Sequence, residues 1–361
     1  MPERTVVVFG AGATKACGGP LTNEILPHAF EHANQLDREQ FLGRLEHFLI
    51  ENFNLPASQA ERKPEHYPNL PLLLSLIDKA IDQRQPFTPS WQVSDLQYVR
   101  DALEYTVFAL LELELRTLTS NNPYQTLLSK LPMSGAQAAT VISLNYDLIA
   151  DNSMATLSNA IPNAGLPDYG CDISTQLYKS REHFGRLLKL HGSLNWIYCP
   201  NCRRLDIGVS QSGRSTSKVL EELYGSVRLE EKYSCKAVAC VQCTAPVRPV
   251  LITPTQLKDY RNPHISRVWY EAGRALRDAQ AAIFVGYSLP DDDLDVAYLL
   301  KRGLSHLKSN KITVVEWTAP GEPTELDQHP VGKRYRTLFG PELEWRPMGF
   351  ANWVTTWPGP A

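Results

Sequence analysis

The chain has 361 residues, of which 43% are hydrophobic and 21% charged, as is ordinary for a globular protein with one large domain and an insert, or with two domains. Its net charge of −3 gives no broad electrostatic attraction to nucleic acid or to an acidic membrane surface. The opening apolar run is too short for a signal peptide, and no stretch is long enough to span a bilayer, so we expect a cytoplasmic protein.

A short β-branched run, Thr5-Val6-Val7-Val8-Phe9, opens the chain and ends in Gly10-Ala11-Gly12. This pattern is typical of a buried strand that enters a tight turn, and we expect a helix from Leu21 onward. Because glycine has no side chain, the backbone N–H groups of such a turn can approach a pyrophosphate closely. The third glycine of the usual dinucleotide motif is replaced by Lys15, so the loop differs from that of a dehydrogenase. A purely structural turn is the alternative.

Residues 24–132 have apolar side chains at helical spacing, with proline-containing joints between the segments. One example is the segment Leu72-Leu73-x-x-Leu76-Ile77, and Pro71 suits the first turn of its helix. The stretch is too long for a simple crossover between strands, and we interpret it as a helical insert.

Four further buried strands are predicted, at residues 139–144, 187–190, 281–285 and 311–315. In open α/β sheets the ligand crevice lies beyond the carboxyl ends of the strands. The small and polar residues that follow these strands are therefore candidates for one site: Asn145 and Asp147, His191, Gly286 and Ser288, and Glu316.

Asn145, Asp147 and His191 each have a structural alternative. Asn145 and Asp147 suit a polar turn in which Asp147 caps the following helix. A single histidine is more often structural than catalytic, yet imidazole titrates near neutral pH and suits proton transfer.

Seven cysteines are an odd number for a disulfide framework, and two Cys-x-x-Cys pairs indicate a metal site instead. Cys199 with Cys202 and Cys240 with Cys243 offer four thiolates for tetrahedral zinc. Cys235 could replace Cys240, although Cys240 fits the spacing better. Such a closed site stabilises the fold and does not catalyse.

Three other segments carry weaker signals. The stretch from Ile265 to Arg277 is amphipathic and predicts a helix packed on the sheet. The acidic run of residues 291–295 could bind a metal, but we favour a solvated helix amino terminus, which the helix dipole stabilises. The carboxyl tail around Trp353 and Trp357 is predicted to be irregular.

Taken in chain order, these motifs resemble the sirtuin family over most of the chain. The matching segments are Gly10-Ala11-Gly12, Ser143-Leu144-Asn145-Tyr146-Asp147, Leu190-His191-Gly192, the two cysteine pairs and Gly286-Tyr287-Ser288-Leu289. The resemblance implies an α/β fold, with a Rossmann-like parallel sheet, a helical insert and a small zinc-ribbon module. We expect the NAD-binding domain at residues 1–23, 133–196 and 248–361, the insert at 24–132 and the zinc-ribbon module at 197–247.

The resemblance also implies a chemistry, which is attack at the anomeric ribose carbon of NAD⁺ with loss of nicotinamide. The catalytic residues would be His191 as general base, with Asn145 and Asp147 lining the nicotinamide pocket. The remaining NAD⁺ contacts fall into two sets: Gly10, Ala11, Gly12 and Thr14 around the pyrophosphate, and Gly286, Ser288 and Glu316 on the adenosine half. Zinc would be structural, and NAD⁺ would be a substrate.

Two segments depart from the protein-deacylating sirtuins. Residues 19–24 lack the phenylalanine and arginine of the deacylase segment, and residues 252–258 replace the segment that begins acyl-peptide binding. The run Gly286-Tyr287-Ser288-Leu289-Pro290-Asp291 looks like the sirtuin-like NAD⁺ hydrolases of bacterial antiphage defence.

We therefore expect an NAD⁺ hydrolase. A protein-lysine deacylase is the first alternative and a non-catalytic NAD⁺ or ADP-ribose sensor the second. Since uncontrolled hydrolysis would drain the cell of NAD⁺, we also expect latency that a partner protein, self-assembly or a nucleotide signal releases.

Overall fold

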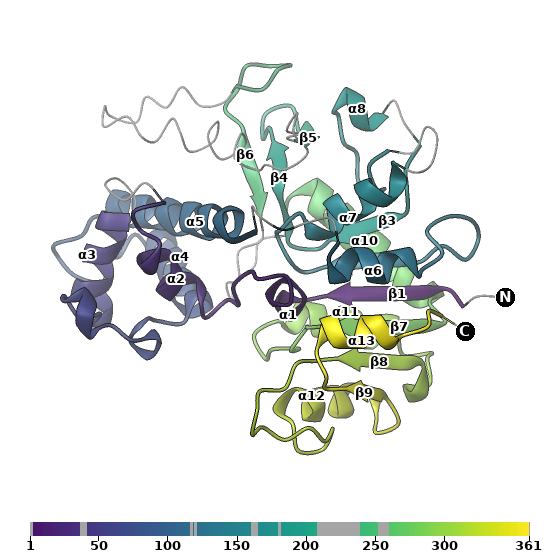
Figure 1. Cartoon of the computed structure of the whole chain (residues 1–361). Helices are drawn as coiled ribbons and strands as arrows, with labels where there is room; N and C mark the ends of the chain where they lie inside the picture. The colour runs from purple at the N-terminus through teal and green to yellow at the C-terminus, as the bar shows by residue number, and fades with distance from the viewer. Residues whose placement is uncertain are drawn as a thin grey trace.

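The computed structural model describes residues 3–36, 42–115, 118, 121–159, 165–179, 182–207, 239–251 and 260–360. Its main sheet has six strands in the spatial order β3-β2-β1-β7-β8-β9, and all neighbours are parallel (Figure 1). Their bounds, in chain order, are β1 (Thr5–Phe9), β2 (Thr140–Ser143), β3 (Arg186–Lys189), β7 (Ala281–Val285), β8 (Ile312–Val315) and β9 (Glu344–Arg346). The strand order reverses between β1 and β7, as in a doubly wound sheet. The predicted α/β, Rossmann-like fold class is confirmed.

The strands form where short apolar, β-branched runs are buried on both faces of the sheet. In β1 all five residues are buried, and Val7 pairs with Val141 of β2 and Ile283 of β7. The four later strands predicted from sequence are present, with no end shifted by more than one residue. Sequence reasoning missed β9, because Glu344-Trp345-Arg346 at the edge of the sheet has no apolar run.

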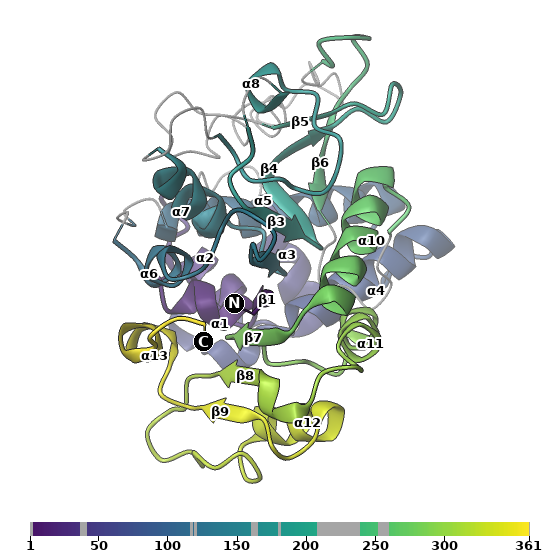
Figure 2. The same cartoon turned by 90° about the vertical axis from the view of Figure 1, so that its right-hand side faces the viewer.

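Helices cover both faces of the sheet (Figure 2). One face carries α10 (Pro263–Asp278), α11 (Leu294–Gly303) and α12 (Pro330–Phe339), and the other carries α6 (Pro123–Ser129), α7 (Ile149–Ser158) and α13 (Phe350–Thr356). The amphipathic helix expected at 265–277 is α10, which begins at Asn262-Pro263. The Asn262 side chain caps it by accepting from the backbone N–H groups of His264 and Ile265.

The prediction of an irregular carboxyl tail is wrong for residues 350–356. They form α13, and Trp353 is buried in the main core. The Lys130 ammonium donates to the backbone carbonyls of Val354 and Trp357, which satisfies groups that the end of a helix leaves open. The tail is therefore held to α6 by a contact between residues far apart in the chain.

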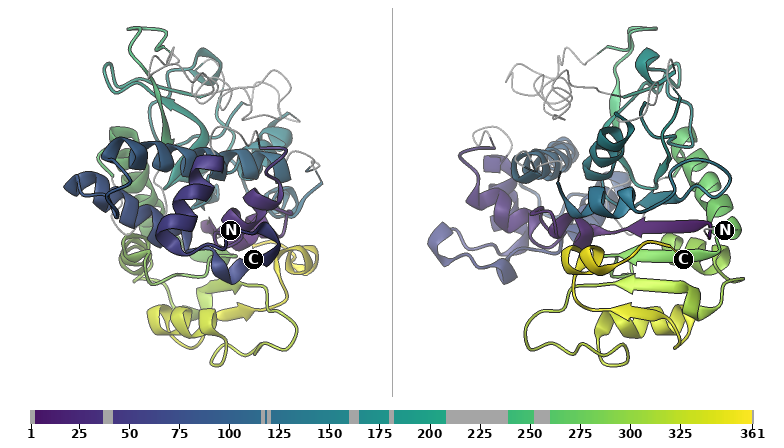
Figure 3. Two further views of the ribbon diagram at one scale, coloured as in Figure 1. Left: turned by 90° about the vertical axis from the view of Figure 1, so that its left-hand side faces the viewer. Right: turned by 45° about the vertical axis from the view of Figure 1, so that its right-hand side comes forward.

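A helical module lies beside the carboxyl ends of the strands (Figures 1 and 3). It consists of α2 (Ile25–Glu31), α3 (Leu42–Phe53), α4 (Leu70–Gln83) and α5 (Val93–Leu115), with two short 3₁₀ turns, Gln59–Glu61 and Pro64–His66. These helices share a second hydrophobic core around Leu45, Phe48 and Leu103. Pro71 lies in the first turn of α4, where Asn69 provides the cap.

A small antiparallel sheet of order β5-β4-β6 follows β3 almost directly. Its strands are β4 (Gly192–Tyr198), β5 (Leu205–Ile207) and β6 (Arg248–Leu251), and the short helix α8 (Gln176–Lys179) precedes β3 in the chain. Leu194 of β4 packs into the core of the helical module, so the small sheet joins the two parts. Cys235 and the segment 252–258, both singled out in the sequence, lie outside the described residues.

Within the described part of the chain, no helix combines the length and the apolar character that crossing a bilayer requires.

Candidate functional site

The glycine turn lies at the point where the strand order of the main sheet reverses. The short helix α1 (Ala11–Lys15) begins in this turn, before the helix expected from Leu21, and α2 starts only at Ile25. The backbone N–H of Gly10 donates to Val285 (3.0 Å) and that of Gly12 to Gly286 (2.8 Å). A crevice at such a reversal is the usual ligand site of an open α/β sheet.

The three glycines at this reversal are required by close backbone contact. Gly286 has φ +60°, and a Cβ placed there would lie 2.3 Å from the backbone nitrogen of Ala13. A Cβ on Gly10 would lie 2.5 Å from Cα of Tyr287. Because real Cβ contacts are never this short, the carboxyl ends of β1 and β7 touch only because these positions lack side chains.

Asn145 ties the end of β2 to the glycine turn. Its side-chain amide donates to the Gly10 carbonyl (2.9 Å), to Oγ1 of Thr14 (3.0 Å) and to the Tyr124 hydroxyl (3.3 Å). The Asn145 side chain is partly exposed, and no described residue donates to its Oδ1. Asn145 therefore combines a positioning role with an acceptor that a ligand can use.

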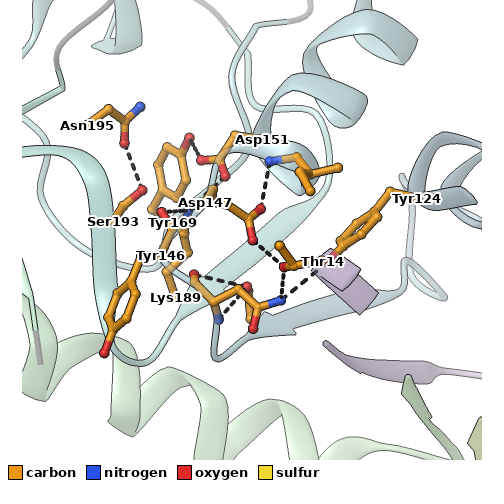
Figure 4. Close-up of polar contacts among 12 residues, drawn as sticks. Thr14, Tyr124, Tyr146, Asp147, Asp151, Tyr169, Lys189, Ser193 and Asn195 are labelled. Carbon is orange, nitrogen blue, oxygen red and sulfur yellow. Dashed lines mark hydrogen bonds and ion pairs between the residues drawn. The ribbon is translucent and has the colours of Figure 1, made fainter. Parts of the chain in front are cut away.

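Asp147 is buried, and its carboxylate points toward Thr14 (Figure 4). Its carboxylate accepts from Oγ1 of Thr14 (2.5 Å) and from the backbone N–H of Ile149 (2.9 Å), so the predicted alternative of a helix cap is present. Burial raises the pKa of Asp147, while the nearby Lys189 charge and the two hydrogen bonds act in the opposite direction. Asp147 thus holds Thr14, a predicted ligand residue, through a buried hydrogen bond.

Lys189 lies beneath these groups and is completely buried. Its ammonium donates to the Asp147 carbonyl (2.6 Å) and forms an ion pair with Asp151 (2.9 Å), which also accepts from the Tyr169 hydroxyl (2.6 Å). We call Thr14, Asp147, Asp151, Tyr169 and Lys189 the Lys189 cluster (Figure 4). A buried charge is costly unless it is paired, and here each charged group has partners.

His191 lies at the junction of the two sheets, between the end of β3 and the start of β4. Gly192, which follows it, has φ +82°, a conformation that favours glycine and turns the chain away from the main sheet. Nδ1 of His191 lies 3.1 Å from the Leu144 carbonyl, directly before Asn145. The imidazole is 9% exposed and 6.4 Å, ring centre to ring centre, from Tyr146.

Asp293 lies near the Nε2 side of the His191 ring. Its Oδ1 lies 4.0 Å from Nε2 of His191, and its Oδ2 accepts from the Tyr287 hydroxyl (2.8 Å). The expectation of a solvated acidic run is wrong for Asp293, which is only 6% exposed, although it holds for the exposed Asp291, Asp292 and Asp295. We call His191, Tyr287 and Asp293 the His191 group.

A series of contacts connects the residues at the carboxyl ends of β1, β2, β3 and β7. It passes from Gly10 to Asn145, from Leu144 to His191, from His191 to Asp293, from Asp293 to Tyr287 and from Gly286 to Gly12. The structure therefore brings Asn145, His191 and the glycine turn to one edge of the sheet.

Ser288 and Glu316 lie farther along the same edge, after β7 and β8. The Ser288 side chain is exposed, and its carbonyl accepts from Nε of Arg334 (2.8 Å). The Glu316 carboxylate accepts from the Trp317 N–H (2.9 Å), and burial raises its pKa above the ordinary value. No contact links Ser288 or Glu316 to His191 among the described residues.

The four predicted metal ligands come together in the small sheet. Their sulfur atoms lie within 4.8 Å of one another, with Cys199 to Cys243 at 3.4 Å and Cys202 to Cys240 at 3.6 Å. Tetrahedral zinc with Zn–S bonds of about 2.3 Å requires sulfur separations of about 3.8 Å.

The two cysteine pairs also share a backbone geometry. The residue after each pair, Arg203 or Thr244, has a left-handed conformation, and Cys199 and Cys240 each donate an N–H to a carbonyl five residues later. Two such knuckles that face each other fit a structural zinc ion, which the four cysteines would hold as a closed site.

Sequence reasoning missed Lys189, Asp151 and Asp293. A lysine inside an apolar strand was the available signal for Lys189, since a strand buried on both faces has no solvated position for it. Asp293 gave no distinct signal, because its neighbours in sequence are equally acidic.

No family model and no curated protein matches the sequence. Among solved structures, a sirtuin from work on sirtuin substrate affinity is similar, with 15% identity over 97% of this chain and 91% of that chain and a TM-score of 0.42. A Sir2 homologue in complex with NAD has 14% identity over 92% of this chain and 87% of that chain, with a TM-score of 0.38. The fold class rests on the parallel sheet itself, and the site on its own geometry.

Proposed function

We propose that this chain is a sirtuin-like NAD⁺ hydrolase that cleaves the bond between nicotinamide and ribose and releases nicotinamide and ADP-ribose. The observation that carries the proposal is the placement of the His191 imidazole at the same edge as the glycine turn, with Asn145 between them. A proton acceptor next to the turn at a strand-order reversal suits a reaction on a bound nucleotide.

Each residue then has a task. The glycine turn, Gly10-Ala11-Gly12, lets the pyrophosphate approach the backbone, with Thr14 at its side, and the adenosine half extends toward Gly286, Ser288 and Glu316. Since Asn145 Oδ1 has no donor among the described residues, it is assigned to the ribose or the carboxamide. Asp147 acts through Thr14, to which it is hydrogen-bonded, rather than by contact with the reacting carbon.

The chemistry suits this arrangement. Loss of nicotinamide from NAD⁺ passes through an oxocarbenium-like state, so the pocket must stabilise positive charge at the ribose. A nearly buried base limits the water that reaches this carbon. His191 takes the proton of the attacking water, and the electron pair of the broken bond goes to the nicotinamide nitrogen.

A protein-lysine deacylase is the second candidate, favoured by the zinc-type cysteine cluster. The sequence of residues 19–24 argues against it, because this segment lacks the phenylalanine and arginine expected of a deacylase. A sensor that binds NAD⁺ or ADP-ribose without turnover is the third candidate.

One assay separates the three functions. Purified protein is incubated with NAD⁺, with and without an acetyl-lysine peptide, and nicotinamide is followed. Release without peptide supports the hydrolase, release only with peptide supports the deacylase, and binding without turnover supports the sensor. Because a hydrolase in antiphage defence must be latent until triggered, the assay is repeated over a range of protein concentrations and with candidate protein partners. The helical module is the surface that we assign to such control.

Site variants test the assignment. His191→Ala is expected to lower nicotinamide release by about 100-fold or more, as loss of a general base does, and Asn145→Ala should lower it by about 100-fold through loss of substrate positioning. Both variants should keep the zinc content of the parent protein, because the cysteine cluster lies in a different sheet. His47→Ala, which removes an exposed histidine of α3, is the matched control. Full activity in both site variants would show that the reaction occurs elsewhere.

A further inference from the structure

The outer surface of α10 and α11 carries three large exposed apolar side chains. Tyr298 at the middle of α11 is 63% exposed, Leu294 one turn before it is 74% exposed, and Tyr270 of α10 is 56% exposed. The two helices lie side by side on one face of the sheet (Figure 2). Single exposed apolar residues are ordinary, but a group of them on neighbouring helices indicates a contact surface.

A cavity of about 200 Å³ lies between the two helices on this surface. Its lining includes two tyrosines, two glycines and two arginines: Tyr270, Tyr298, Gly273, Gly303, Arg277 and Arg302. Both arginines are exposed. The surface therefore combines aromatic area with positive charge and suits a partner that offers an apolar side chain and a carboxylate.

The exposed residues of α11 are arranged symmetrically along the helix about Tyr298. At 1.5 Å rise per residue, Leu294 and Arg302 lie about 6 Å from it in opposite directions. Asp295 and Lys301 lie about 4.5 Å from it in the same way. All five are exposed, whereas the buried face of the helix consists of Val296, Leu300 and Gly303.

Asp295 and Arg302 lie on the same side of Tyr298, toward α10. At 3.6 residues per turn they are about 60° and 40° around the helix from Tyr298. Arg302 lines the cavity against α10. Burial and the nearby charge of Asp295 raise the pKa of the Tyr260 hydroxyl, just before α10, which agrees with this placement of Asp295. This side of the helix thus carries an acid near one end and a base near the other.

Leu294 and Lys301 lie at matching angles on the opposite side of Tyr298. There the Lys301 ammonium donates to a backbone carbonyl of α12, which leaves its aliphatic stem along the surface. Both sides of the exposed face are therefore complementary to themselves when the helix direction is reversed.

We propose that two copies of this chain associate through α11, with the helices antiparallel and a two-fold axis at Tyr298. A two-fold axis pairs residue i with j and j with i, so Asp295 of each copy meets Arg302 of the other. The two Tyr298 rings meet at the axis, and Leu294 packs on the stem of Lys301. The antiparallel arrangement also brings opposite ends of the helix dipoles together.

This symmetry favours a second copy over an unrelated acidic protein, because the same ten residues supply both halves of every contact. The contact gives a surface to the self-assembly expected from the sequence and does not depend on the proposed hydrolysis. The helix begins directly after Asp293 of the His191 group, so the interface adjoins the candidate site.

Charge reversal tests the two ion pairs. Sedimentation velocity of the parent protein over about 1–100 µM should show an equilibrium between monomer and dimer. Asp295→Arg and Arg302→Asp each place like charges opposite one another at both contacts, so either should weaken the dimer by about 10-fold or more. Asp82→Arg and Arg84→Asp, which reverse exposed charges at the end of α4, are the matched controls and should dimerise as the parent does.

An equal mixture of the two α11 variants provides a readout that a general loss of stability would not produce. Asp295 of one variant then meets Arg302 of the other, and the two introduced side chains also have opposite charges. The mixed dimer should recover to within about threefold of the parent affinity. A parent protein that stays monomeric over the whole range would overturn the inference. Reversal variants that dimerise as the parent does, or a mixture that does not recover, would overturn it equally.

Discussion

The Lys189 cluster and the His191 group lie at the same edge of one sheet and differ in the distances between their ionisable groups. In the Lys189 cluster each ionisable group lies 2.5–2.9 Å from a partner atom. In the His191 group the imidazole and the carboxylate are 4.0 Å apart. A set of short contacts among buried charges holds the chain in place, whereas the proposed function gives His191 a role in proton transfer. We therefore assign stability to the Lys189 cluster and chemistry to the His191 group.

The largest expected effect tests whether the Lys189 cluster stabilises the fold. Lys189→Met keeps the length of the side chain but leaves the buried Asp151 without its counter-ion. Breaking a buried ion pair in this way costs about 3–5 kcal/mol, so the free energy of unfolding in urea should fall by that amount. Lys79→Met removes an exposed lysine and should change it by less than about 0.5 kcal/mol. Equal, small losses in both variants would show that the Lys189 cluster does not stabilise the fold.

The Lys189 cluster also shows how far sequence reasoning reaches. Buried strands leave local signals, so the strand that ends at Asn145 and the one that ends at His191 were predictable. Their convergence followed from the rule that parallel strands present their carboxyl ends at one edge. The four cysteines were equally predictable, since ligand spacing is a local property.

The partners of buried charges were not predictable. Whether Lys189 is solvated or paired depends on Asp151, 38 residues away in the chain, and whether Asp293 is buried depends on His191 and on Tyr287. In the run of four aspartates at residues 291–295, only the fold distinguishes the buried one from its exposed neighbours. Local periodicity predicts elements well, but the pairing of charges is a tertiary property.

A second prediction removes one tyrosine hydroxyl from the Lys189 cluster and one from the His191 group. Tyr169→Phe deletes a hydroxyl that donates to Asp151, and Tyr287→Phe deletes one that donates to Asp293. Loss of a buried hydrogen bond to a carboxylate should lower the free energy of unfolding by about 1–3 kcal/mol in each variant. Only Tyr287→Phe should also lower kcat for nicotinamide release, by about fivefold, because the freed carboxylate no longer holds its orientation. A comparable loss of kcat in Tyr169→Phe would remove the distinction between the two regions.

The smallest expected effect concerns the pH dependence of the Lys189 cluster. Burial raises the pKa of Asp147 above its ordinary value of 3.8, so the folded state holds a proton that the unfolded chain has released. The stability that this proton contributes is complete below pH 3.8 and is lost as the pH rises through the raised pKa. Asp147→Asn cannot titrate at this position.

The comparison therefore requires unfolding in urea at several pH values between about 4 and 7. Relative to Asp147→Asn, the parent protein should become less stable as the pH increases, while Asp292→Asn should show no such trend. If the parent protein instead gains stability with rising pH, the Lys189 charge and the hydrogen bonds from Thr14 and Ile149 outweigh the cost of burial. Asp147 would then be ionised within the closed cluster, and its charge would have to be counted among those that face the ribose.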